Sequence, residues 1–135
     1  MFTRKFVAAA AVAFGVMCAT LSWVAPASAH TVQDLQIVGD QITDRQQEIS
    51  YYTGLLNDLG PQQQFAEQTW RDADDACSNT VNQEECRSEA YSTYLDSISS
   101  INMDADAYTA TIAGLQVELA ELQQEYYDIY HELYG

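Results

Sequence analysis

"DACSNTVNQEEC", residues 75–86, decides how this chain folds, because its two cysteines flank a short polar loop. An even pair of cysteines in an exported chain predicts an oxidised Cys77–Cys86 disulfide. A metal thiolate pair is the alternative, but no nearby histidine or further cysteine completes a ligand set. We therefore expect residues 78–82 to reverse the chain and the disulfide to staple the two arms beside that loop.

Apolar residues recur at alternating spacings of three and four on both sides of the loop, which is the heptad pattern of packed helices. No stretch alternates with the period of a strand, so the predicted fold class is all-α. The predicted arms are residues 32–78 and 83–134. The first stripe comprises Leu35, Val38, Ile42, Ile49, Tyr52, Leu56, Leu59, Ala66, Trp70 and Ala73. The second comprises Tyr91, Tyr94, Ile98, Ile101, Ala105, Tyr108, Ile112, Leu115, Leu119, Leu122, Tyr126, Ile129 and Leu133.

The two stripes match when the arms are aligned antiparallel. Placing Leu35 opposite Ile129 also places Trp70 opposite Tyr94, and it brings the two cysteines to the same level. The same alignment sets Tyr52 against Ile112. The sequence thus predicts a long antiparallel helical hairpin, coiled-coil-like, with a disulfide-stapled tip.

Two local signals mark helix starts and one marks an interruption. Thr31 with Asp34, and Asn82 with Glu85, have the spacing of capping boxes. Gly60-Pro61 predicts a break in the first arm, opposite the poor helix-forming stretch "SSINMDAD" (99–106). Because a two-helix layer buries little apolar area, we expect the hairpin to dimerise, and a fold-back into a compact four-helix bundle is the alternative architecture.

The first 29 residues have the features of a cleaved secretory signal peptide. A basic Arg4-Lys5 pair precedes the apolar run 6–19, and the small-residue motif Ala27-Ser28-Ala29 follows. Cys18 leaves with this segment, and Met17 before it does not fit a lipoprotein signal. We expect a single domain, residues 30–135, that is secreted or periplasmic.

Processing would make an already acidic chain more acidic, from a net charge of −15 to −17. Residues 30–135 carry three arginines and all twenty acidic residues, a net charge of −17. This charge argues against nucleic acid and anionic membrane partners. It is consistent with a solvated surface, with a cationic partner or with bound divalent ions. Arg45 falls on the apolar stripe, and we expect it to reach Glu48 or Glu121.

No catalytic motif stands out, so we expect a non-enzymatic binding or assembly protein that engages a protein partner or itself. Tyr127, Tyr130 and Tyr134 form a second stripe beside the predicted seam. They either broaden the core or supply a contact surface for a homo-oligomer or another partner.

The alternative function is metal binding by the processed N-terminus. Cleavage after Ala29 would give His30 a free α-amine beside its imidazole, and the register brings His131 to the same open end. Amine and imidazole nitrogens suit copper, and less selectively nickel and zinc. No other cofactor is expected.

Overall fold

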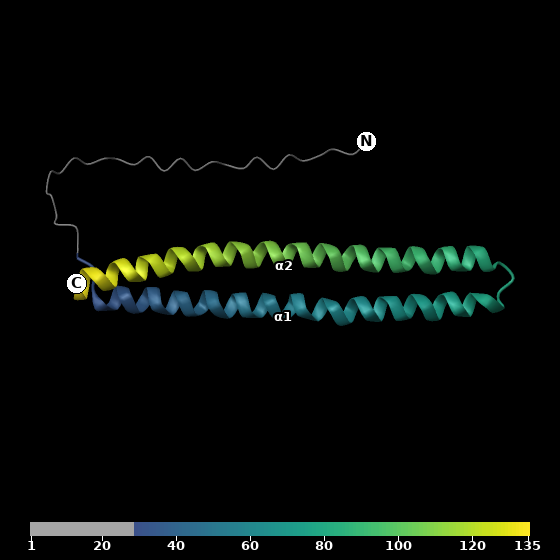
Figure 1. The fold of residues 1–135 in the computed structure, drawn as a ribbon, viewed down its shortest axis with the longest axis horizontal. Coiled ribbons are helices and arrows are strands. Elements are labelled where there is room, and N and C mark those ends of the chain that lie inside the picture. Colours follow the sequence, from purple (N-terminus) through teal and green to yellow (C-terminus); the bar gives the residue numbers. More distant parts are fainter. Residues whose placement is uncertain (1–28) are drawn as a thin grey trace, which may run out of the picture.

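The computed structural model describes residues 29–135 as a pair of long antiparallel helices (Figure 1). Helix α1 spans Val32–Ala76, a short 3₁₀ turn η1 spans Cys77–Asn79, and helix α2 spans Gln83–Tyr134. The helices hold 45 and 52 residues, so at 1.5 Å per residue they run about 68 and 78 Å. The predicted all-α hairpin is therefore confirmed. The proposed export signal falls outside the described residues except for Ala29.

The start of α1 follows the predicted chemistry, but the start of α2 does not. The Thr31 hydroxyl accepts a hydrogen bond from the Asp34 backbone N–H, and the Asp34 carboxylate accepts one from the Thr31 N–H. This capping box satisfies amides that have no partner within the helix. Asn82 provides no such side-chain bond, so the second predicted capping box is wrong. Acidic Glu84 and Glu85 instead favour the first turn of α2 through the helix dipole.

Helix α1 continues through Gly60 and Pro61, so the predicted break is absent. Proline in a helix interior leaves the carbonyl four residues earlier, here that of Asn57, without its amide donor. Pro61 is exposed, and water can reach the interrupted position. Because Leu59 is buried just before it and α2 is helical throughout residues 99–106, packing on α2 maintains the helix across the weak point. The fold-back into four helices is consequently not seen.

The core is thin and is best developed at the open end of the hairpin, where both chain ends of the described region lie. Leu35, Val38 and Ile129 form a buried cluster, with Ile42, Leu122 and Leu133 packed against it. This places Leu35 beside Ile129, as the predicted register requires. Farther along, the rings of Trp70 and Tyr94 stack with centroids 5.2 Å apart. The Tyr52 ring lies 6.1 Å from that of Tyr108, one turn away from its expected partner Ile112.

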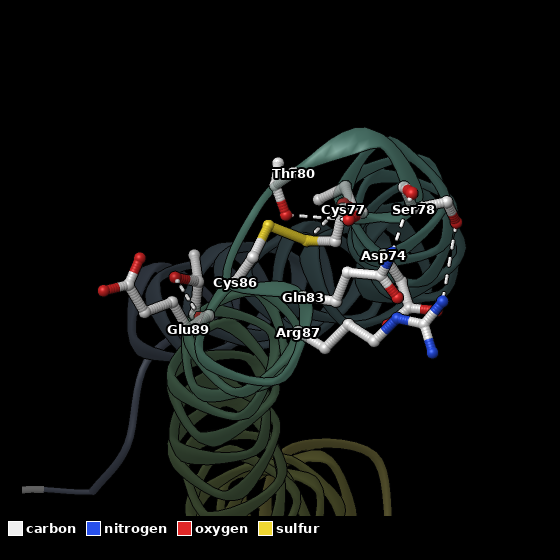
Figure 2. The surroundings of a disulfide bond; sticks show 10 residues. Asp74, Cys77, Ser78, Thr80, Gln83, Cys86, Arg87 and Glu89 are labelled. Carbon is white, nitrogen blue, oxygen red and sulfur yellow. Dashed lines mark hydrogen bonds and ion pairs between the residues drawn. A yellow bond between two sulfur atoms is a disulfide. The ribbon is translucent and has the colours of Figure 1, made fainter.

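At the tip, the Cys77–Cys86 disulfide joins the two helices across a Cα–Cα distance of 5.6 Å (Figure 2). Cys77 is fully buried. The Thr80 hydroxyl donates to the Cys77 carbonyl at 2.8 Å, and the Gln83 side chain donates to the Ser78 carbonyl at 2.9 Å. Side chains of the loop and of the first residue of α2 thus satisfy the carbonyls of Cys77 and Ser78, where the backbone leaves α1. The covalent bond sets the register of the two helices.

Candidate binding groove

An apolar groove of about 700 Å³ runs along one side of the hairpin between α1 and α2, in the half nearer the tip. On α1 it extends from Pro61 to Ala73, and on α2 from Ala90 to Asp104. The largest side chains that line it are Phe65, Trp70, Tyr94 and Ile101.

The groove exists because small side chains occupy positions that face the partner helix. On the apolar stripe of α1, Ala66 and Ala73 stand one and two heptads after Leu59, and Ala90 and Ser97 are the small residues that line the groove on α2. Between Leu59 and Cys77 no residue of α1 is buried, and none of α2 is buried before Leu115. Two helices with short facing side chains cannot fill the space beside their seam, so a hollow remains.

Two groove residues lack the surroundings that their chemistry favours. The Phe65 side chain is 74% exposed although a phenyl ring gains about 1.5–3 kcal/mol from burial. The Trp70 indole N–H is buried and has no hydrogen-bond partner. Buried polar groups normally find partners, because an unsatisfied one costs about 1–3 kcal/mol. The exposed Phe65 ring would gain from an additional group placed in the groove.

Acidic side chains border the groove on both helices. Asp58 and Asp72 lie seven residues before and after Phe65, so the three share one stripe along α1. On α2, Thr93 and Ser100 line the groove, and Glu89 and Asp96 precede them by four residues. Residues four apart are neighbours on a helix surface, so these carboxylates form the next stripe outward. We call Asp58, Asp72, Glu89 and Asp96 the acidic rims.

The acidic rims are not neutralised by the basic residues of the tip half. Arg71 pairs with Glu67, and the Arg87 guanidinium lies 3.7 Å from Asp74. Figure 2 shows the Glu89 carboxylate pointing away from Arg87, on the other side of α2. None of the ion pairs within residues 29–135 uses a rim carboxylate. The groove is therefore an apolar strip between two rows of exposed negative charge.

The tyrosine stripe lies at the opposite end of the hairpin from this groove. Tyr127, Tyr130 and Tyr134 are 47–59% exposed, so they do not broaden the core. The rings of Tyr130 and Tyr134 lie 5.0 Å apart, which makes a continuous aromatic surface on α2. Their role as a partner interface remains a prediction.

The two histidines lie at the open end but have different neighbours. The His30 N–H donates to Glu132 Oε1 at 3.0 Å, and His30 Nδ1 lies 2.5 Å from Glu132 Oε2. This hydrogen bond raises the pKa of His30 and lowers the pKa of Glu132. His131 instead packs on the Tyr127 ring, with centroids 4.2 Å apart.

The described residues contain no cluster of three or more histidine, cysteine or acidic side chains able to hold a metal ion. Copper binding through His30 and His131 therefore stays a prediction. It would require the His30 ring to exchange its Glu132 contact for the metal.

Arg45 contacts one of its two expected carboxylates and a different one on α2. Its guanidinium contacts Glu48 at 2.6 Å, as expected, but its interhelical partner is Glu118 at 3.2 Å rather than Glu121. Glu118 precedes Glu121 by three residues, so both lie on the same side of α2. Arginine on the apolar stripe is thus anchored by two exposed carboxylates.

Sequence reasoning did not predict the groove. The available signal was the change from Leu56 and Leu59 to Ala66 and Ala73 along the apolar stripe of the first arm. In the described part of the chain, neither helix has an apolar stretch sufficient to span a bilayer. No protein-family model, curated protein or solved structure matches this chain at a significant level.

Proposed function

We propose that this chain is an exported, acidic, non-enzymatic binding protein that engages a protein partner through the groove between α1 and α2. The observation that carries the proposal is the 74% exposed Phe65 on the wall of an apolar groove. Contiguous exposed apolar surface bordered by polar residues is found at protein interaction sites. Aromatic side chains at the centre of such a surface supply most of the binding energy of an interface.

The chemistry of the lining favours binding over catalysis. The polar side chains that line the groove are hydroxyls, the Gln62 amide, the Trp70 indole and the Asp104 carboxylate, with no histidine, cysteine or lysine among the lining residues. Threonine and serine hydroxyls need an adjacent base to act as nucleophiles. The groove is suited instead to cover apolar side chains and to orient them with a few hydrogen bonds.

The proposal is tested by capture from an envelope extract of the source organism, using residues 30–135 as bait and native mass spectrometry for stoichiometry. Phe65→Ser removes the exposed ring from the groove. Val117→Ser is the matched control, because Val117 is 60% exposed in the other half of α2. We expect a partner to be retained by the wild type and the control and lost by Phe65→Ser. Equal retention by all three baits would refute a groove-mediated function.

A further inference from the structure

We propose that the occupant of the groove is a single amphipathic α-helix of another protein, with lysine or arginine on both flanks of its apolar face. This inference rests on the proposed function and specifies the chemistry of the partner. Three features of the groove support it: its length, its floor and its acidic rims.

The length of the groove matches a few turns of helix. From Pro61 to Ala73 the groove follows twelve residue steps of α1, which correspond to about 18 Å at helical rise. An added helix of three to four turns would span this distance. Apolar residues at positions i, i+3, i+4 and i+7 then lie on one face, which is the usual pattern for a helix bound in a groove.

The floor of the groove permits a helix to approach closely. Ala66, Ala73 and Ala90 present methyl groups, and helix axes can come within about 8–10 Å where contact side chains are small. Phe65 supplies an apolar wall on α1, and Ile101 of the α2 stripe adds apolar surface. Leucine-sized side chains of the incoming helix would fill the hollow and cover the Phe65 ring.

The acidic rims determine the charge of the flanks. Asp58 and Asp72 border the groove on α1, while Glu89 and Asp96 border it on α2. A helix lying between them presents residues flanking its apolar face to both rows. Lysine or arginine at those positions would pair with carboxylates that have no cationic partner in the described structure.

The same charges disfavour a second copy of this chain as the occupant. A second hairpin would bring its own acidic surface against the rims, and residues 30–135 contain only three arginines. Within those residues the structure already pairs all three with carboxylates. Like charges brought together across an interface oppose association, so a cationic helix fits better than self-docking.

Trp70 allows a direct test, because it lines the groove and is the only tryptophan of residues 30–135. The hairpin contacts described above all lie within those residues. The probe is an 18-residue synthetic helical peptide without tryptophan, with leucine and alanine on one face and lysine on both flanks. The control peptide has glutamate at every lysine position. Trp70 fluorescence is titrated with each peptide at low and physiological salt.

We expect saturable binding of the lysine peptide, weakened by salt, and no binding of the glutamate peptide. Phe65→Ser should weaken binding at least about tenfold, the factor that corresponds to the lower end of the burial energy of a phenyl ring. The triple variant Asp72→Asn/Glu89→Gln/Asp96→Asn should weaken binding several-fold and reduce the salt dependence. The control triple Asp40→Asn/Asp44→Asn/Glu121→Gln removes the same charge away from the groove and should leave the affinity within about twofold.

The residues changed in both triple variants are exposed, so circular dichroism at 222 nm should show an unchanged fold in each. Equal affinity for the two peptides, or equal weakening by both triple variants, would overturn the inference. Self-association of the processed chain that Phe65→Ser abolishes would also overturn it, in favour of a second copy. If capture from the extract depends on Phe65 but the lysine peptide does not bind, the proposed function stands and only the partner chemistry is refuted.

Discussion

Reducing the Cys77–Cys86 disulfide should lower the free energy of unfolding by about 3 kcal/mol. The bond joins residues nine apart in the sequence and therefore closes a loop of about ten residues in the unfolded chain. In the chain-entropy description, releasing a loop of this size raises the entropy of the unfolded state by about 9 cal/mol/K, which gives that value at 25 °C. The folded tip keeps its hydrogen bonds, because Thr80 and Gln83 bond to carbonyls rather than to sulfur.

The assay is urea unfolding of the oxidised and reduced protein, followed by circular dichroism at 222 nm. With a urea dependence of about 1–3 kcal/mol per molar, the midpoint should fall by about 1–3 M on reduction. Cys77→Ser/Cys86→Ser is the control for the reductant, since adding it should not change that variant. Reduction removes no atom of either side chain and breaks only the bond between the sulfurs. Comparing the oxidised with the reduced protein therefore separates the covalent constraint from the packing of the buried Cys77 side chain.

Coincident midpoints for the oxidised and reduced protein would refute the reasoning that the bond restricts the unfolded chain. A peptide map showing free thiols or a bridge between two chains would refute the register itself. Trp70 fluorescence adds a local readout, because its stack on Tyr94 depends on the relative position of the two helices. Reduction without a slip should leave this fluorescence unchanged under native conditions.

The other predictions concern α1, the open end and assembly. Pro61→Ala should raise the free energy of unfolding by up to about 3 kcal/mol in urea, because it restores a backbone donor inside α1, whereas a loss of stability would mean that the helix needs the proline. Glu132→Gln should lower the pKa of His30 toward 6.5 in an NMR titration; an unchanged pKa would mean that Glu132 does not hold the ring. In the wild type the His30–Glu132 pair should contribute fully between about pH 4.5 and 6.5, weakening as acid protonates Glu132 below its lowered pKa and as His30 loses its proton above its raised pKa. Replacing Tyr127, Tyr130 and Tyr134 together with serine should shift a homodimer to monomer in analytical ultracentrifugation, and a wild type that is monomeric at high concentration would contradict this.

The sequence predicted the hairpin because periodicity and a covalent link act together. Heptad spacing alone allows two helices to pair in several registers that differ by seven residues. Cys77 and Cys86 remove that freedom, since a disulfide requires Cα atoms within a few ångströms of each other. The Leu35–Ile129 and Trp70–Tyr94 contacts follow from this one constraint.

The errors arose where local signals compete with tertiary packing. Gly60-Pro61 predicts a helix break, but Leu59 packs on a continuous α2 and the helix persists. Asn82 with Glu85 has capping-box spacing, but the Asn82 side chain is not used to cap α2. Residue type and spacing describe what a segment favours alone, whereas the observed ends and interruptions also depend on what the neighbouring helix and loop provide.

The groove escaped prediction for a different reason. Heptad positions indicate which side chains face the partner helix, but not whether those side chains fill the space between the helices. Ala66 and Ala73 fit the stripe as well as leucine would, so the periodicity remains intact while the volume falls. The acidic rims were visible only as part of a large net charge. The structure showed that Phe65 is an exposed wall of the groove, and this places Asp58 and Asp72, which share its stripe on α1, along the groove border.

The two halves of the hairpin are therefore held together in different ways, and this difference bears on the proposed function. The open half has the buried cluster around Ile129, whereas the tip half has a stacked Trp70–Tyr94 pair and a disulfide. A pair of helices that must leave space for a third helix cannot also fill that space with its own leucines. A covalent bond at the tip keeps the two walls in register without occupying the groove. The disulfide thus supplies, in the tip half, the constraint that apolar packing supplies at the open end.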